Sequence, residues 1–106
     1  SDLPEVGDGT RILVDRLWPR GLTREKAHID LWLKDISPTT ELRIWFNHDI
    51  ERWEEFKTKY LTELNNNKRP ISILKEQIAK GNVTLIFGAR DELHNEAIIL
   101  RELLSN

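Results

Sequence analysis

The sequence predicts an α/β fold: a small, mostly parallel sheet with helices packed on its faces, in a single domain. Two short apolar runs, residues 12–14 and 83–87, have the composition of strands covered on both sides. Helical segments lie between these runs, as they do where strands run parallel. The chain has 106 residues, the size of one domain, and we expect residues 1–10 to form an irregular lead-in.

The composition supports a folded core and argues against some classes of partner. Hydrophobic residues make up 39% of the chain, and charged residues make up 32%. The 16 basic and 18 acidic residues nearly cancel, giving a net charge of -2. Such a balance gives no electrostatic reason to bind nucleic acid or an anionic membrane.

The chain contains no cysteine, which excludes disulfides, thiolate zinc sites and cysteine nucleophiles. It has no apolar run long enough to span a membrane and no signal-peptide core. We therefore expect a cytoplasmic protein. No motif in the sequence implies a cofactor.

The first predicted strand covers residues 11–17. It ends at Trp18-Pro19-Arg20-Gly21, because proline cannot donate to a strand ladder and glycine permits a turn. Residues 23–26 suit a short helical turn. The apolar residues 31–33 follow, and their pattern leaves the secondary structure open.

The middle of the chain predicts three helices. Ser37 is the expected N-cap of the first, with Pro38 at its first position. Asp49 is the expected cap of the second, residues 50–64, and the third covers residues 71–80 and ends before Gly81. The apolar faces of the first two helices contain Leu42, Trp45, Phe46, Trp53, Phe56, Tyr60 and Leu64.

The last part of the chain predicts a buried strand, residues 83–87, a tight turn, residues 88–91, and a final helix. Asp91 is the expected N-cap of this helix, which runs to about Leu104. Its inward side chains are predicted to be Leu93, Ala97, Leu100 and Leu104.

Polar sequence follows both strands directly. In open parallel sheets, ligands bind in the crevice at the carboxyl ends of the strands. We therefore expect residues 15–21 and 88–95 to lie side by side and to share a cleft. The ligand-binding candidates are Arg16, Trp18, Arg20, Arg43, Arg90 and Asn95, and the acid or base candidates are Asp15, His48 and Asp91.

Each candidate also has a purely structural interpretation. Asp15 and Arg16 could form internal ion pairs, and Arg20 could simply be solvated. Trp18 could belong to the core, as we expect for Trp45 and Trp53.

Two further candidates could serve as helix caps. Asp91 could be a plain N-cap, and His48-Asp49 a cap at a helix junction. We predict no metal site, because His28 and His94 do not add a recognisable ligand spacing to this pair.

Nearly the whole chain from about Gly9 onward resembles the YeaO-like family of uncharacterised bacterial domains. The rare run Val14-Asp15-Arg16-Leu17-Trp18-Pro19-Arg20-Gly21 makes the resemblance specific. Residues 32–38, 42–49, 53–56, 60 and 91–97 match as well. The resemblance implies a fold and a site position but no established activity. Family members usually carry a further apolar strand before the segment matching residues 4–9. Its absence here would leave an unpaired sheet edge.

Two functions remain open from the sequence. The first is a site for a small anionic ligand bearing phosphate or carboxylate, either binding only or enzymatic. The alternative is a non-catalytic protein-interaction domain, in which the Arg/Trp loop contacts a partner or a second copy. Nucleic-acid binding is the weakest hypothesis, because no extended basic face exists.

Overall fold

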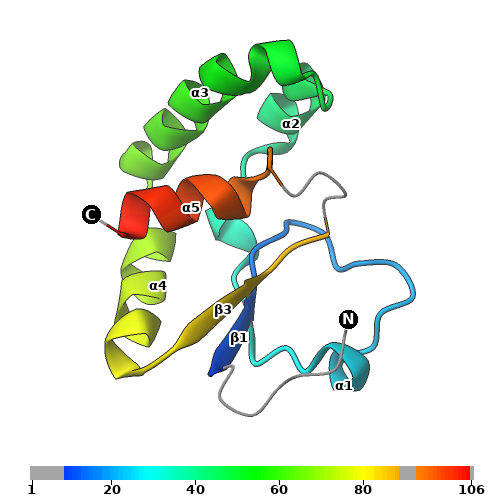
Figure 1. Ribbon diagram of the computed structural model, residues 1–106, viewed down its shortest axis with the longest axis vertical. Coiled ribbons are helices and arrows are strands. Elements are labelled where there is room, and N and C mark those ends of the chain that lie inside the picture. The colour runs from blue at the N-terminus through cyan, green and yellow to red at the C-terminus, as the bar shows by residue number, and fades with distance from the viewer. Residues whose placement is uncertain (1–8, 89–92, 106) are drawn as a thin grey trace.

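The computed structural model describes residues 9–88 and 93–105. Its sheet contains the strands β1 (Thr10–Leu13), β2 (Leu31–Trp32) and β3 (Val83–Ile86) in the order β2-β1-β3. β1 is the central strand and pairs in parallel with both neighbours (Figure 1). The predicted α/β fold with a parallel sheet is confirmed.

Side chains of β1 and of Val14, the residue after it, alternate between two apolar clusters. Ile12 and Val14 belong to the larger cluster, whereas Leu13 belongs to a smaller one with Ala27 and Ile29. All of these side chains are buried. Because successive residues of a strand point to opposite faces, both faces of the sheet are covered.

Helices lie on both sides of the strands. The larger cluster packs against α2 (Thr40–Phe46), α3 (Trp53–Asn66), α4 (Arg69–Lys80) and α5 (Glu96–Leu104). The short α1 (Arg24–Ala27) lies on the other side, with the smaller cluster (Figure 1). No helix among the described residues is long and apolar enough to cross a membrane.

The first strand is shorter than the predicted residues 11–17. The ladder continues just past β1, where the Val14 amide donates to the Ile86 carbonyl at 3.0 Å. Asp15 then leaves the sheet, and its carboxylate accepts a hydrogen bond from the Gly88 amide. The apolar run of residues 12–14 could not reveal this long-range contact.

Leu31–Trp32 form a real edge strand, which the sequence left unassigned. Two residues are too few to show a periodicity, and only pairing with Ile12 and Leu13 defines β2. The predicted turn at residues 23–26 is α1, displaced by one residue.

The helix expected to start at Ser37 starts later. Lys34–Ile36 form a 3-10 turn, and the Ser37 hydroxyl donates back to the Lys34 carbonyl at 2.8 Å. The N-cap of α2 is Thr39, whose hydroxyl accepts from the Leu42 amide at 3.2 Å. The same hydroxyl donates to Glu63 Oε2 at 2.6 Å, so tertiary contact favours Thr39 over Ser37.

The two following helices are largely as predicted. Asp49 caps a 3-10 turn, Ile50–Arg52, that leads directly into α3. α4 begins at Arg69, two residues before the predicted start, and ends at Lys80, so Pro70 lies in its first turn. Phe56, Tyr60 and Leu64 are buried, while Trp45 and Trp53 are half-buried and pack against the core.

The start of the last helix was predicted wrongly. α5 begins at Glu96, and its N-cap is Asn95, whose Oδ1 accepts from the Ile98 amide at 3.2 Å. Asp91, the expected cap, lies outside the described residues. Leu93 is 72% exposed instead of inward, whereas Ala97 and Leu100 are buried as expected and Leu104 is half-buried.

Candidate functional site

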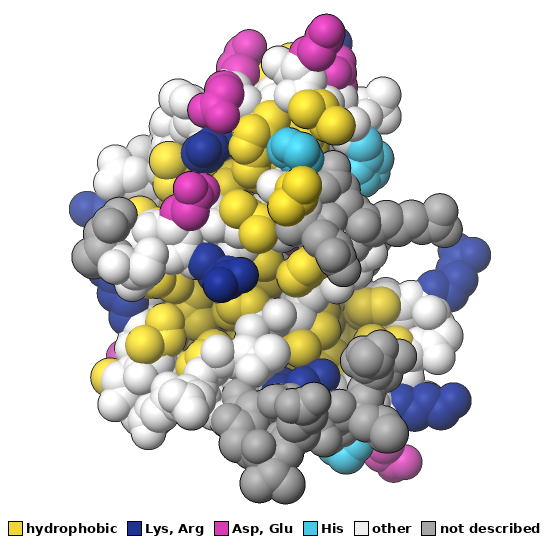
Figure 2. All heavy atoms as spheres, in the orientation of Figure 1, with side chains coloured by type: hydrophobic (Ala, Val, Ile, Leu, Met, Phe, Trp, Pro, Cys, Tyr) yellow, Lys and Arg dark blue, Asp and Glu magenta, His cyan; other side chains and the backbone are white. Residues whose placement is uncertain are grey.

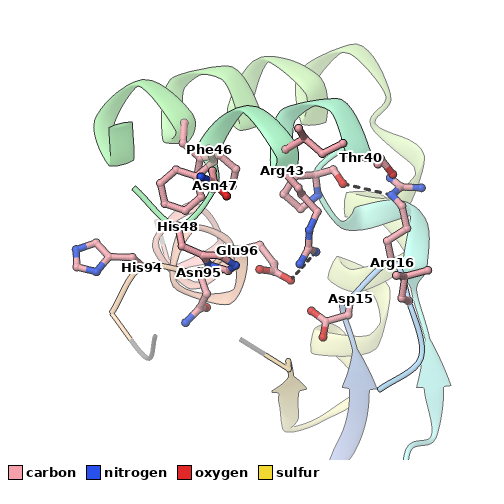
Figure 3. Close-up of a pocket in the computed structure, with 14 residues that line it drawn as sticks. Asp15, Arg16, Thr40, Arg43, Phe46, Asn47, His48, His94, Asn95 and Glu96 are labelled. Carbon is pink, nitrogen blue, oxygen red and sulfur yellow. Dashed lines mark hydrogen bonds and ion pairs between the residues drawn. The ribbon is translucent and has the colours of Figure 1, made fainter. Parts of the chain in front are cut away.

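A cavity of about 430 Å³ lies at the carboxyl end of β1, between α2 and the start of α5. Its volume is in the range of small-molecule sites. The polar residues that line it include Asp15, Arg16, Arg43, His48, Asn95 and Glu96. Of these, Asp15, Arg43 and Glu96 point toward one another from separate elements (Figure 3).

Asp15 is held at the floor of the cavity. Its side chain is buried, and its Oδ2 accepts a 2.6 Å hydrogen bond from the Gly88 amide. Its carbonyl accepts from the indole of Trp32 at 2.8 Å. The residue therefore connects the ends of β1 and β3 and has a fixed position.

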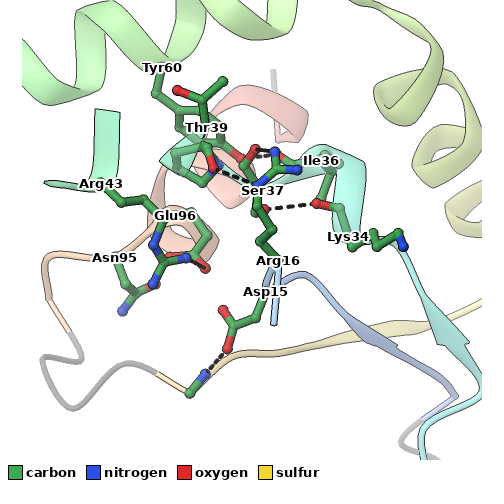
Figure 4. Close-up of polar contacts among 12 residues, drawn as sticks. Asp15, Arg16, Lys34, Ile36, Ser37, Thr39, Arg43, Tyr60, Asn95 and Glu96 are labelled. Atoms are coloured by element: carbon green, nitrogen blue, oxygen red, sulfur yellow. Dashed lines mark hydrogen bonds and ion pairs between the residues drawn. The ribbon is translucent and has the colours of Figure 1, made fainter. Parts of the chain in front are cut away.

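Glu96 is the first residue of α5 and faces Asp15 (Figure 4). It is only 5% exposed, and its Oε1 has no hydrogen-bond partner among the described residues. Arg43 Nη1 lies 3.9 Å from this oxygen, which is close enough for an ion pair but too far for a hydrogen bond. Burial, and then the neighbouring carboxyl of Asp15, raise the pKa of Glu96 to about 8.

The two arginines of the cavity differ in their surroundings. Arg16 is half-buried, and it donates from Nε to the Pro38 carbonyl at 3.3 Å and from Nη2 to the Ser37 carbonyl at 3.1 Å. Arg43 projects from α2, and 42% of its side chain is exposed. Arg16 thus braces the start of α2, while Arg43 presents its guanidinium to the cavity.

Further contacts fix the segment before α2 (Figure 4). The buried Tyr60 hydroxyl donates to the Ile36 carbonyl at 2.6 Å. Glu63 accepts from both the amide and the hydroxyl of Thr39, at 3.0 and 2.6 Å. α3 therefore sets where α2 begins, and with it the position of Arg43.

Apolar side chains also line the cavity. Phe46 and Phe56 line it and stack with a centroid distance of 4.3 Å. Leu17 and Ile44 also line it, although they are 79% and 72% exposed. Hydrophobic side chains reach the surface between charged groups on the face shown in Figure 2.

Two histidines also line the cavity. His48 is exposed and follows Asn47 in the left-handed region, with φ of 54° and 48°. The His94 ring packs edge-on against Trp53 at 5.1 Å. In the described part of the chain, no three His, Asp or Glu side chains are grouped as metal ligands.

The structure brings together some of the candidates from the sequence and separates others. Asp15, Arg16, Arg43, His48 and Asn95 all line the cavity. The expected proximity of the segments after β1 and β3 is seen in the contact between Asp15 and Gly88.

Trp18 and Arg20 do not line the cavity. Trp18 is half-buried in the smaller apolar cluster, where its ring packs edge-on against Trp32 at 5.4 Å. Its indole donates to the Leu22 carbonyl, and Arg20 is exposed. Arg90 and Asp91 lie outside the described residues.

Sequence reasoning missed Glu96. The signal was the asparagine before it: Asn95 is a good N-cap residue, and the apolar run 97–100 follows directly. Placing the cap at Asp91 made Glu96 an ordinary surface residue. Because α5 starts later than predicted, Glu96 is its first residue and faces Asp15 at the carboxyl end of β1.

Comparison with known proteins gives consistent results. Residues 1–106 match the model of a family described as the inactive DUF488-N3 subclade. The chain is 38% identical to the uncharacterized protein YeaO of Escherichia coli over 103 residues, which cover 97% of this chain and 90% of YeaO. It is 35% identical to the uncharacterized protein Rv3073c of Mycobacterium tuberculosis over 98 residues, 92% of this chain and 82% of that protein. No solved structure gives a significant match.

Proposed function

Because the chain belongs to the YeaO-like family, within the inactive DUF488-N3 subclade, we propose that it binds a small anionic ligand without transforming it. The ligand's carboxylate or phosphate pairs with Arg43 at the cavity between α2 and α5. The word "inactive" in the subclade's description favours binding over catalysis.

One observation carries the proposal: Arg43 lines the cavity with 42% of its side chain exposed, and its 3.9 Å ion pair with Glu96 is too long for a hydrogen bond. Arg16 and Arg43 are cationic, and Asp15 supplies a carboxylate. Glu96 has its pKa raised to about 8, so it is mostly uncharged at pH 7. The surplus positive charge lies at Arg43, whose planar guanidinium suits a carboxylate or phosphate.

The apolar walls define the rest of the ligand. Phe46 and Phe56 line the cavity together with Arg43, and their rings stack on each other. A cavity of about 430 Å³ accommodates a molecule of metabolite size. An anion joined to an apolar or aromatic group therefore suits the site better than inorganic phosphate.

A thermal-shift panel of nucleotides, sugar phosphates and aromatic carboxylates tests the proposal. A ligand at a hundred times its dissociation constant adds about 2.7 kcal/mol to the free energy of unfolding. Arg43→Gln should abolish the shift, whereas Arg69→Gln, an exposed arginine at the start of α4, should keep it. Absence of any shift across the panel would contradict the proposal.

Exposed leucine and isoleucine side chains support a second candidate, the protein-interaction domain. Leu17 and Ile44 expose large apolar surfaces at the mouth of the cavity. The contact surface would then centre on these residues instead of on Trp18. A partner that is lost in Leu17→Asp but retained in Arg43→Gln would favour this function over ligand binding. We further propose that the domain works in the cytoplasm, in keeping with its cysteine-free composition.

A further inference from the structure

Acidic and basic groups occupy different parts of the cavity. Asp15 and Glu96 are buried, 8% and 5% exposed, whereas Arg43 is exposed over 42% of its side chain and extends from α2 toward Glu96 (Figure 3). A purely anionic ligand would use only Arg43 and would meet the Asp15 carboxylate below it. A ligand carrying both charges would use both parts.

Building on the proposed function, we propose that the ligand is an α-amino acid with an apolar side chain. Its carboxylate pairs with Arg43, its ammonium group lies against the carboxyl groups of Asp15 and Glu96, and its side chain packs on Phe46 and Phe56.

The unpartnered oxygen of Glu96 is the first argument. Oε1 is buried, lies in the cavity lining and accepts no hydrogen bond from the described residues. A buried acceptor without a donor is unfavourable, by an amount comparable to a lost hydrogen bond. An ammonium group has three donors and no acceptor, and it would satisfy Oε1 while also pairing with Asp15.

The spacing of Arg43 and Glu96 is the second argument. The donor Nη1 and the acceptor Oε1 are 3.9 Å apart, which is too long for a direct hydrogen bond. In an α-amino acid, the carboxylate and ammonium groups are bonded to the same carbon, so an acceptor and a donor lie side by side. Such a ligand can bridge Arg43 and Glu96, and the exposed part of Arg43 lets its guanidinium turn toward the carboxylate.

The apolar walls are the third argument. The stacked rings of Phe46 and Phe56 lie beside the polar groups, so a ligand held at its α-carbon would direct its side chain onto them. Aromatic side chains gain most from such a surface. Phenylalanine is therefore the natural probe.

The protonation of Glu96 gives the inference a pH dependence of affinity that can be measured. Glu96 has a pKa of about 8, so ammonium binding at lower pH must displace its proton. Affinity should rise up to about tenfold per pH unit between pH 6 and pH 8. The charged and titratable groups around this carboxyl are Asp15, Arg16, Arg43 and Tyr60, with His48 and His94 at the rim.

Isothermal titration calorimetry with three probes tests the inference. The probes are phenylalanine, 3-phenylpropanoate, which lacks the ammonium group, and 2-phenylethylamine, which lacks the carboxylate. We expect phenylalanine to bind at least about tenfold more tightly than either analogue, the loss expected for one charged hydrogen bond. Glu96→Gln should reduce the preference for phenylalanine over 3-phenylpropanoate and remove the rise with pH, whereas the exposed control Glu76→Gln should change neither.

The outcomes separate the two proposals. Equal binding of phenylalanine and 3-phenylpropanoate by the unmodified protein would overturn the amino-acid inference and leave the anion site standing. Loss of binding for all three probes, with hits elsewhere in the carboxylate and phosphate panel, would also overturn only this inference. If no anion binds at all, both the amino-acid inference and the proposed function fail. Should Glu96→Gln fail to fold by circular dichroism, Asp15→Asn should likewise reduce the preference for phenylalanine over 3-phenylpropanoate, because the ammonium group then loses the Asp15 carboxylate.

Discussion

The Gly88 backbone amide donates a 2.6 Å hydrogen bond to Oδ2 of Asp15, across 73 positions of sequence. This contact joins the carboxyl ends of β1 and β3 and fixes the carboxylate at the cavity floor. A Cβ atom on residue 88 would lie 2.9 Å from the same oxygen, so the approach needs glycine.

Gly88→Ala should therefore be destabilising. The added methyl group forces Asp15 away and breaks a charge-assisted hydrogen bond, at a cost of about 1–3 kcal/mol. Urea denaturation of the single and double variants measures it. In an Asp15→Ala background the same change should cost less than about 0.5 kcal/mol, because the clash and the bond are already gone. Equal costs in both backgrounds would show that the contact is unimportant.

The pH dependence of stability should report on Glu96. Its pKa is raised to about 8, so the folded state holds a proton that the unfolded chain loses near pH 4 to 5. The free energy of unfolding should fall as pH rises from about 5 to 8, by up to about 1.4 kcal/mol per pH unit from this group. Above the folded pKa this contribution becomes flat.

Glu96→Gln isolates that contribution. Urea titrations at pH 5.5, 6.5 and 7.5 should show a flatter pH profile for Glu96→Gln than for the unmodified protein and for the control Glu76→Gln. Parallel profiles for all three proteins would mean that Glu96 is ionised in the folded state at neutral pH.

The hydrogen bond from the Tyr60 hydroxyl to the Ile36 carbonyl should contribute measurably to the free energy of unfolding. Tyr60→Phe removes a buried hydroxyl that donates to the Ile36 carbonyl and leaves that acceptor without this donor. We expect a loss of about 1–2 kcal/mol in thermal or urea unfolding. Burial also raises the pKa of the Tyr60 phenol well above its usual value. Its ionisation in an absorbance titration should therefore appear only when the protein unfolds.

Thr39 should contribute more to stability than its neighbour Thr40. Thr39→Ala removes the N-cap of α2 and its hydrogen bond to Glu63, for a loss of about 1–2 kcal/mol. Thr40→Ala, at an exposed helical position, should stay within about 0.5 kcal/mol of the unmodified protein. Because α2 carries Arg43, Thr39→Ala should also weaken ligand binding in the thermal-shift panel. Similar stabilities for the two variants would contradict this role of Thr39.

Arg43 and Arg20 distinguish the site in the structure from the wider site predicted from sequence. Arg43→Gln should lower the affinity for an anionic ligand at least about tenfold, whereas Arg20→Gln should change it less than about twofold. Calorimetry with the best ligand of the panel measures both. A larger loss in Arg20→Gln would restore the Arg/Trp loop as the binding element.

Local patterns predicted most of the fold. The parallel strands at residues 10–13 and 83–86 and the helix from Asp49 onward have clear apolar runs or caps within their own sequence. Ser37 and Asp91 look like caps equally well, but the observed N-caps are Thr39 and Asn95. Contact with Glu63 selects Thr39, and no local pattern contains that contact.

The candidate site was likewise predictable only where it did not depend on long-range contacts. The carboxyl ends of parallel strands share one edge, so Asp15 and Asn95 could be placed together from topology alone. Trp18 could not be excluded in the same way. Trp18 lies outside the site because it packs against Trp32, which belongs to a strand too short to be recognised from the sequence. Glu96 was missed because its burial depends on where α5 begins.

A crystal structure with the tightest-binding anion of the panel is the most direct test of the site. We predict electron density for its carboxylate or phosphate about 3 Å from the Arg43 guanidinium, with the apolar part of the ligand against Phe46 and Phe56. Density for the anion elsewhere, with Arg43 still beside Glu96, would contradict the account.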